Sequence, residues 1–297
     1  MKDTIIISLV GEQPIPNLLA LLYARPKMAA FVLTERTKEV YERLCSVLKL
    51  RGVEWGMMIE DEPIEVDPYN LPVCERKIKR FLEEKGWSPD GIVFNLTGGT
   101  KPMALAAYRL AEQLSCPFLY IESEGKKSVV YHYRFSDGLK LEKRDEVPLL
   151  IDIDFYLRAH LADYHVADFH NEFEKMIYGV LSQELDEVKH SVKPLGGLEI
   201  DLVLRCGNRV GIAETKTRKK AQSKEGIEQI ITAAEQRFLG TYTKKFLIID
   251  REYEPNNFAL ARAHGITVVE LPSAQSGELS REDTEKLIQT VKKELGG

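Results

Sequence analysis

The stretch that decides the fold of the first half of the chain is Asn95-Leu96-Thr97-Gly98-Gly99-Thr100-Lys101-Pro102-Met103. It follows an apolar run at 91–94, which is typical of a buried strand, and precedes the alanine- and leucine-rich run 103–111, which is typical of a helix. The two glycines allow backbone N–H groups to approach a ligand, Lys101 adds a positive charge, and Pro102 suits the first helical position. The stretch therefore predicts a strand-to-helix loop that holds an anion at a helix N-terminus.

The same pattern continues on both sides of this stretch. The predicted strands are 4–10, 29–33, 53–59, 91–96 and 117–122, and the predicted helices between them are 18–23, 37–50, 74–85 and 103–111. Strands that alternate with helices predict a mostly parallel, doubly wound α/β sheet of the Rossmann-like kind. Two further strands, 128–135 and 139–143, flank a Ser136-Asp137-Gly138 turn and predict an antiparallel hairpin that completes the sheet.

The loop after the first strand, 8–17, and the loop 95–103 both follow the carboxyl ends of predicted parallel strands. Ligands of doubly wound sheets bind at these ends, so the two loops are expected to form one pocket. The segment Gly98-Gly99-Thr100-Lys101 does not satisfy the pattern GxxxxGK[ST], because the glycines are adjacent and no Ser or Thr follows the lysine. This disfavours a nucleoside triphosphatase.

Length and composition limit the remaining possibilities. A chain of 297 residues predicts two domains at about 150 residues each. The net charge of −5 argues against a protein that grips nucleic acid with its whole surface. No apolar run approaches the ~18 residues that span a bilayer, so we expect a cytoplasmic protein without a membrane partner. The four cysteines form no CxxC pair, which disfavours a zinc site or a disulfide framework.

The second half contains a predicted hairpin, 198–205 and 209–217, around the two-residue loop Gly207-Asn208. This loop sets Cys206 against Arg209. Counting outward then places Asp201 opposite Glu214 and Glu199 opposite Lys216, with all four side chains on one face.

Like charges opposed at ~4.5–5.5 Å are destabilising unless a cation lies between them. Carboxylate oxygens with room for water suit Mg²⁺ or Mn²⁺, so the hairpin predicts a divalent metal site. Such an ion polarises a phosphodiester and activates water, and Lys216 could stabilise the developing negative charge.

Asp201 followed by Glu214-Thr215-Lys216 resembles the D…ExK motif of the PD-(D/E)XK restriction-endonuclease-like superfamily. The resemblance implies a metal-dependent endonuclease with Lys216 as catalytic lysine and metal ligands from Asp201, Glu214 and a carboxylate on the preceding helix. Glu174 matches that carboxylate best, with Glu172 as the alternative, and Gln229 on the following helix is a weaker match.

The run Asn-x-Thr-Gly-Gly-Thr-Lys-x-Met after the fourth predicted strand resembles the signature of CARF domains, the sensors of type III CRISPR systems. The resemblance implies a homodimer activated by a cyclic oligoadenylate, with cyclic tetra-adenylate expected. It implies ligand contacts from Ser8, Gly11, Gln13, Asn17, Asn95, Thr97, Gly98, Gly99, Thr100, Lys101 and Met103. The expected organisation is a CARF domain at 1–145, a connecting segment at 146–164 and a restriction-endonuclease-like α/β nuclease domain at 165–297.

The resulting hypothesis is an oligoadenylate-activated nuclease of antiviral defence that cleaves DNA, RNA or both. Two alternatives stay open: a non-catalytic regulator gated by the oligoadenylate, and a ring nuclease that degrades it. His160, His165 and His170 recur every five residues, which does not align them on one helical face, so ordinary packing or surface roles are expected. The run Arg218-Lys219-Lys220 is either a solvated face or a grip on the substrate backbone.

Overall fold

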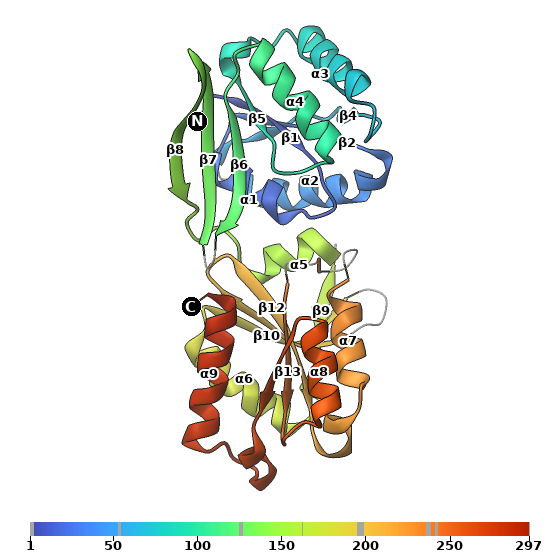
Figure 1. Cartoon of the computed structure of the whole chain (residues 1–297), viewed down its shortest axis with the longest axis vertical. Coiled ribbons are helices and arrows are strands. Elements are labelled where there is room, and N and C mark those ends of the chain that lie inside the picture. Colours follow the sequence, from blue (N-terminus) through green and yellow to red (C-terminus); the bar gives the residue numbers. More distant parts are fainter. Residues whose placement is uncertain are drawn as a thin grey trace. The chain divides into compact units, whose positions relative to one another are not determined.

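The computed structural model describes residues 3–52, 55–124, 127–161, 163–194, 199–235, 239–240 and 243–296. The chain forms two compact units, Met1–Leu150 and Ile151–Gly297, and each builds its own sheet (Figure 1). In the described residues, no helix combines the length and apolarity needed to cross a membrane.

The first unit is a sheet with the order β3-β2-β1-β5-β6-β7-β8, in which β4 also pairs with β2. Its strands are β1 (Ile5–Leu9), β2 (Met28–Leu33), β3 (Met58–Ile59), β4 (Ile64–Glu65), β5 (Ile92–Asn95), β6 (Phe118–Glu124), β7 (Lys127–Ser136) and β8 (Gly138–Glu146). The strands from β3 to β6 are parallel, and β7 and β8 add an antiparallel hairpin. The predicted doubly wound sheet with its closing hairpin is confirmed.

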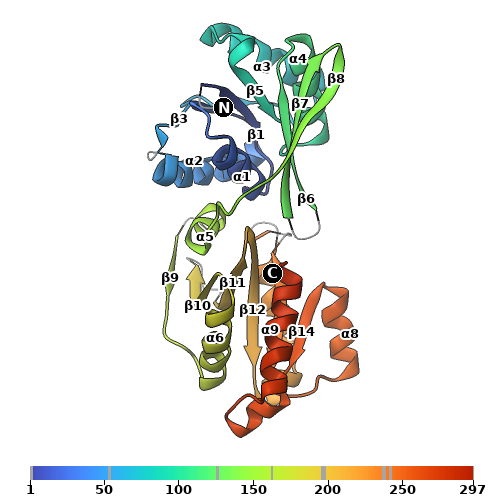
Figure 2. The ribbon, with the colours of Figure 1, turned by 90° about the vertical axis from the view of Figure 1, so that its left-hand side faces the viewer.

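Among the described residues of this unit, the α-helices that cover the two faces of the sheet are α1 (Ile15–Ala24), α2 (Lys38–Gly52), α3 (Leu71–Lys85) and α4 (Lys101–Gln113). Helices α3 and α4 bury alternate residues of the central strands, such as Ile7, Leu9 and Phe94, and α1 and α2 lie on the opposite face (Figure 2). Short 3₁₀ helices, η1 (Glu35–Thr37) and η3 (Pro89–Gly91), complete the connections.

Two local predictions in this unit need correction. The strand expected at 53–59 is only Met58–Ile59, and its first two residues lie outside the described part of the chain. Helix α1 starts at Ile15 rather than Leu18, because Pro16 fits the first helical turn. The earlier start places Asn17 inside the helix instead of in the loop.

The second unit is a six-stranded sheet with the order β14-β13-β12-β11-β10-β9. Its elements are α5 (Ile153–Leu161), β9 (Tyr164–Val166), α6 (Glu172–Glu184), β10 (Glu187–Pro194), β11 (Ile200–Cys206), β12 (Arg209–Lys216), η4 (Arg218–Gln222), α7 (Glu225–Ala233), β13 (Lys244–Ile249), α8 (Pro255–Ala263), β14 (Ile266–Glu270), η5 (Pro272–Ser276) and α9 (Arg281–Leu295). Strands β9 to β12 are antiparallel neighbours, whereas β12, β13 and β14 run parallel. Helices α6 and α9 pack on one face of this sheet around Phe246 and Leu202.

The predicted hairpin register is confirmed, since Cys206 pairs with Arg209 and the ladder runs to Leu202 opposite Ala213. Strand β9 was not predicted, because three residues are too few to show a period. The segment 146–164 contains the end of β8, helix α5 and the start of β9, and α5 belongs to the second unit. Helix α7 ends at Ala233, and residues 236–238 lie outside the described part of the chain.

Candidate functional site

The loop between β5 and α4 is built on a buried polar cluster. Ser8 on β1, Asn17 on α1 and Asn95 on β5 are all fully buried. The Ser8 hydroxyl donates to Asn17 Oδ1 at 2.6 Å, and Asn95 Nδ2 donates to Ser8 Oγ at 2.8 Å and to Asn17 Oδ1 at 3.2 Å. These bonds join three elements beneath the loop. The cluster therefore fixes the loop from below instead of lining its surface.

The loop itself is held by its two threonines. Thr97 donates its hydroxyl to Asn95 Oδ1 at 2.7 Å and accepts from the Ile121 N–H at 2.9 Å. Thr100 is the N-cap of α4 and donates its hydroxyl to the Pro68 carbonyl oxygen at 2.6 Å. Both hydroxyls therefore shape the loop, and the exposed charge at its end is that of Lys101.

Close packing against the β1 end explains the glycines. A Cβ on Gly98 would lie 2.0 Å from the Leu9 carbonyl oxygen, and one on Gly11 would lie 3.1 Å from the Gly99 nitrogen. Gly99 has a φ of +75°, which disfavours any larger residue. The two predicted loops thus meet, as their place at the carboxyl ends of β1 and β5 implied.

Two residues at this site, Asn17 and Met103, differ in what they can offer a ligand. Asn17 Nδ2 has no hydrogen-bond partner among the described residues, and it lies 3.1 Å from where a Gly98 Cβ would sit. A buried donor beside a glycine loop at a helix N-terminus fits an anionic ligand. Met103, in contrast, is buried in the core under Gly99, and its N–H donates to the N-cap Thr100, so its side chain packs the loop from beneath.

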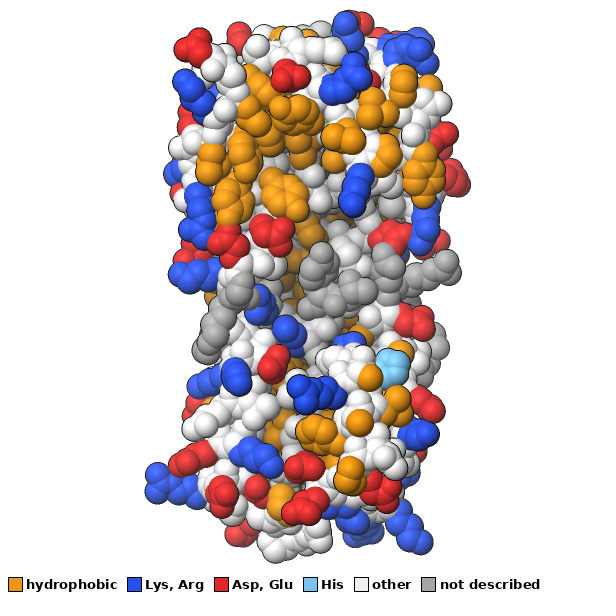
Figure 3. Space-filling model, viewed as in Figure 1, with side chains coloured by type: hydrophobic (Ala, Val, Ile, Leu, Met, Phe, Trp, Pro, Cys, Tyr) orange, Lys and Arg blue, Asp and Glu red, His pale blue; other side chains and the backbone are white. Residues whose placement is uncertain are grey.

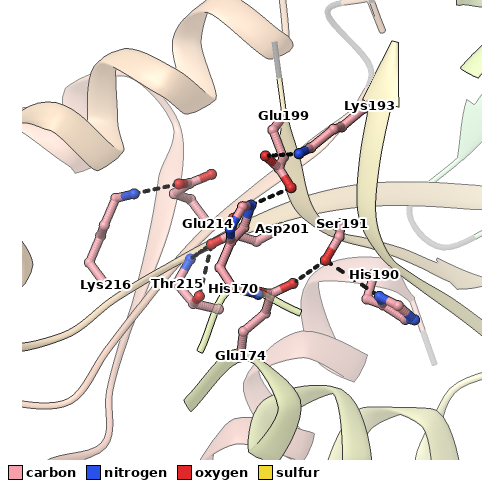
Figure 4. Close-up of polar contacts among 10 residues, drawn as sticks. All are labelled: His170, Glu174, His190, Ser191, Lys193, Glu199, Asp201, Glu214, Thr215 and Lys216. Carbon is pink, nitrogen blue, oxygen red and sulfur yellow. Dashed lines mark hydrogen bonds and ion pairs between the residues drawn. The ribbon is translucent and has the colours of Figure 1, made fainter. Parts of the chain in front are cut away.

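In the second unit, three carboxylates gather beside one lysine (Figure 4). Asp201 lies on β11, Glu214 and Lys216 lie on β12, and Glu174 lies on α6. The three acids are buried, with exposed fractions of 8%, 4% and 0% for Asp201, Glu214 and Glu174. Glu172, the alternative to Glu174 for the helix carboxylate, is exposed.

Thr215, the middle residue of the ExK motif, orients Asp201. Its N–H and its hydroxyl donate to Asp201 Oδ2 at 2.7 and 2.8 Å. Lys216 Nζ lies 2.6 Å from Glu214 Oε1, with both side chains largely buried. Each motif residue thus has a contact that fixes its position.

Glycine also permits the packing above Lys216. A Cβ on Gly226 of α7 would lie 2.8 Å from Leu247 Cδ1 and 3.3 Å from Lys216 Cγ. Helix α7 therefore covers the apolar stem of the lysine. On the same helix, Gln229 Oε1 is buried and has no hydrogen-bond partner within the described part of the chain.

Burial and like charge govern the electrostatics of this cluster. Burial raises the pKa of Glu214 to about 8, and the neighbouring Asp201 charge adds to the increase while Lys216 opposes it. Burial also raises the pKa of Asp201 against the hydrogen bonds from Thr215, and that of Glu174 against a bond from Ser191. The cluster is thus short of positive charge.

This shortage makes stability depend on pH. The pKa of Glu214 is about 8 in the folded protein against an ordinary value of 4.5, so its contribution is full below pH 4.5 and is lost as pH rises to about 8. Between pH 5 and 8 in EDTA, the free energy of unfolding should fall relative to Glu214→Gln, by at most about 1.4 kcal/mol per pH unit. Urea unfolding followed by circular dichroism measures this difference. Glu228→Gln, at an exposed position of α7, is the control, and a difference between wild type and Glu214→Gln that does not change with pH would contradict the assignment.

The residues present fit a hard divalent cation. Within the described residues, no group of three or more His, Cys, Asp or Glu side chains converges to hold a metal. Mg²⁺, however, commonly binds through one or two carboxylates and several waters. Asp201 and Glu214 supply two such carboxylates, and Glu174 has both oxygens hydrogen-bonded, which suits an outer position.

The structure changes two sequence interpretations near the cluster. Glu199, which the sequence places opposite Lys216, forms ion pairs with Lys193, at 3.0 Å, and with His170. The cause is β10, which lies beside β11 and pairs Val192 with Ile200, next to these residues. His170 thus lies at the site, although its spacing indicated an ordinary role.

Residues 5–144 match the family model described as the Card1 CARF domain. A search of curated protein sequences gives no match.

Several solved structures have a similar fold. Can2 from Sulfobacillus thermosulfidooxidans, in complex with cyclic tetra-adenylate, has a TM-score of 0.74 at 16% identity, covering 96% of this chain and 98% of that chain. Protein VC1899 from Vibrio cholerae has a TM-score of 0.74 at 14% identity, covering 99% of both chains. A type III CRISPR defence DNA nuclease activated by cyclic oligoadenylate has a TM-score of 0.56 at 17% identity, covering 86% of this chain and 46% of that one. The match to the CARF model lies within the first unit, and the fold of the chain is similar to that of Can2 and VC1899.

Proposed function

We propose that this chain is a metal-dependent nuclease of type III CRISPR antiviral defence, dormant until a cyclic oligoadenylate binds its first unit. The observation that carries the proposal is the buried cluster of Asp201, Glu214 and Lys216 on one hairpin, in a chain whose residues 5–144 match a CARF model. Its arrangement supports a PD-(D/E)XK centre.

In the proposed reaction, Asp201 and Glu214 hold Mg²⁺ or Mn²⁺, with Glu174 as an outer ligand or water contact. When bound, the ion polarises the phosphodiester and lowers the pKa of a bound water. Thr215 keeps the Asp201 carboxylate oriented through its two hydrogen bonds. Lys216 places its ammonium where negative charge develops on the phosphate oxygen.

In the proposed sensor, the cyclic oligoadenylate lies on the loop after β5, and cyclic tetra-adenylate is the expected form. Backbone N–H groups of Gly98 and Gly99 and the Lys101 ammonium contact its phosphates. Thr97 and Thr100 shape the loop, and Ser8, Asn17 and Asn95 support it. Gly11 and Gln13 complete the pocket from the β1 side.

The experiment is cleavage of plasmid, single-stranded DNA and RNA by the full chain, with Mn²⁺ and with cyclic oligoadenylates of different ring sizes. Cleavage is expected only when the cognate ring and the ion are both present, and EDTA should stop it. If no substrate is cut with any ring, the nuclease proposal is wrong. Oligoadenylate binding without cleavage would favour a non-catalytic regulator.

We also propose that the protein works as a homodimer, because a cyclic ligand with repeated units suits paired half-sites. The first unit has an apolar sheet face that supports this (Figure 3). Tyr133 of β7 pairs with Phe118 of β6 and Leu141 of β8. Leu141 is 53% exposed, and Leu105 on α4 is 56% exposed.

Leu141→Glu should therefore shift the protein from dimer to monomer. Burying a carboxylate in an apolar interface costs free energy that the dimer cannot recover. Light scattering after size-exclusion chromatography measures the mass. Lys140→Glu, on the other face of the same strand, should leave the mass unchanged, and equal masses for all three proteins would rule out this face as the interface.

A further inference from the structure

The backbone of Ser191, on β10, has an unusual conformation next to the acidic cluster. Its φ is +45°, in the left-handed region that disfavours residues with a Cβ. The ladder with β11 pairs His190 with Leu202 and Val192 with Ile200 on either side of it. The Ser191 carbonyl oxygen still accepts from the Ala167 N–H at 3.0 Å. The strand thus continues, and the unusual conformation is confined to one residue.

This conformation directs the side chain at a carboxylate. The Ser191 hydroxyl donates to Glu174 Oε1 at 2.7 Å, and both residues are fully buried (Figure 4). A hydrogen bond to a carboxylate in a water-poor site is strong. Local strain that persists at such a point commonly serves a function.

Two further hydrogen bonds hold Glu174 in place. Its Oε2 accepts from the His170 N–H at 2.9 Å, and its own N–H donates to the N-cap Asn171 at 2.9 Å. Among the described residues, Ser191 is the one side chain that donates a hydrogen bond to the Glu174 carboxylate. The rotamer of Glu174 therefore depends on Ser191 and on the backbone before α6.

The neighbouring residue His190 contacts the Ser191 hydroxyl. His190 Nδ1 lies 3.4 Å from Ser191 Oγ, and the His190 ring stacks on Phe169 with centroids 3.9 Å apart. When Nδ1 carries the hydrogen, the serine oxygen accepts it and keeps its own hydrogen for Glu174. The contacts run from a stacked imidazole through a strained serine to the carboxylate.

We propose that Ser191 is a positioning residue, whose strained backbone and hydroxyl hold the Glu174 carboxylate toward the Asp201–Glu214 pair. The inference rests on the proposed nuclease function. It assigns a role to a residue that lies outside the D…ExK motif. Its full burial keeps Ser191 from contacting the substrate, so it acts through Glu174.

Two variants separate positioning from packing. Ser191→Ala loses the hydrogen bond and keeps the strained φ, whereas Ser191→Gly loses the bond and relieves the strain. Ser191→Gly should thus unfold at the same temperature as wild type or higher, and Ser191→Ala at a lower one. Both should weaken Mn²⁺ binding and cleavage by about 10- to 100-fold, as is usual for groups that orient a metal ligand. Ser182→Ala, an exposed position on α6, is the control.

Mn²⁺ affinity by calorimetry, cleavage rate and melting temperature are measured on the full chain. Loss of affinity in both variants, whatever their stability, supports positioning. A stable Ser191→Gly with wild-type affinity and rate would overturn the proposal. If wild type itself neither binds Mn²⁺ nor cleaves, the proposed function fails. The positioning of Glu174 by Ser191 is then tested on its own by a crystal structure of Ser191→Gly. A Glu174 carboxylate that leaves its place supports the inference, and one that keeps its place refutes it.

Discussion

Glu214→Ala and Lys216→Met should each abolish oligoadenylate-dependent cleavage while leaving oligoadenylate binding intact. Glu214→Ala removes one of the two carboxylates proposed to face the ion. Lys216→Met removes the ammonium but keeps an apolar stem beneath Gly226, so α7 retains its packing. Loss of one preorganised charge donor at a reacting phosphate costs about 10²–10³-fold in rate, and loss of a metal ligand should cost more.

The measurement is the initial rate of substrate cleavage at saturating ligand and Mn²⁺, with ligand affinity determined in parallel. Lys293→Met is the matched control, because this lysine is exposed on α9 and has no proposed role in the site. Full cleavage by Glu214→Ala would contradict the site. Equal losses in cleavage and in ligand affinity would point to misfolding instead of lost chemistry.

Gly98→Ala should desensitise the protein to its activator. The new methyl carbon would lie 2.0 Å from the Leu9 carbonyl oxygen, so the loops after β1 and β5 must separate. Because a misplacement of about 1 Å in a positioned site can cost 10²-fold, we expect the activating concentration to rise about 100-fold. Mn²⁺ affinity at the acidic cluster should stay unchanged, because Gly98 belongs to the other unit.

Gly91→Ala is the matched control, because a Cβ there would meet nothing within 4 Å. Lys101→Ala tests the same loop without a clash, since its side chain is exposed, and it should weaken activation through lost charge. Titration of cleavage against oligoadenylate measures all three. Normal activation of both Gly98→Ala and Lys101→Ala would exclude this loop as the sensor.

Much of the fold was predictable because its signals are local. Alternating apolar runs and helical periods gave the doubly wound sheet, and the Gly207-Asn208 loop set the register that pairs Cys206 with Arg209. Strands β4 and β9, with two and three residues, are too short to show a period. The sequence pattern places Pro16 in the loop 8–17, although this proline fits the first turn of α1.

The residues of the candidate sites were likewise predictable only where their signal is local in the sequence. The D…ExK spacing placed Asp201, Glu214 and Lys216 together because a two-residue hairpin fixes which residues oppose each other. Contacts that depend on tertiary packing left no such signal. Neither Ser191 nor His170 stands at a motif distance from the acids, and both reach Glu174 only because β10 and the segment before α6 fold beside it.

The glycine at 226 has a consequence for how mutations in this protein should be read. It contributes no functional group, yet any side chain there would press on Leu247 and on the stem of Lys216. In a library of variants selected for antiviral protection, this position should tolerate as little change as the acids themselves. Intolerance to mutation at Gly226 would then reflect the close packing that the Lys216 side chain requires. A list of sensitive positions would therefore include a residue that touches no substrate.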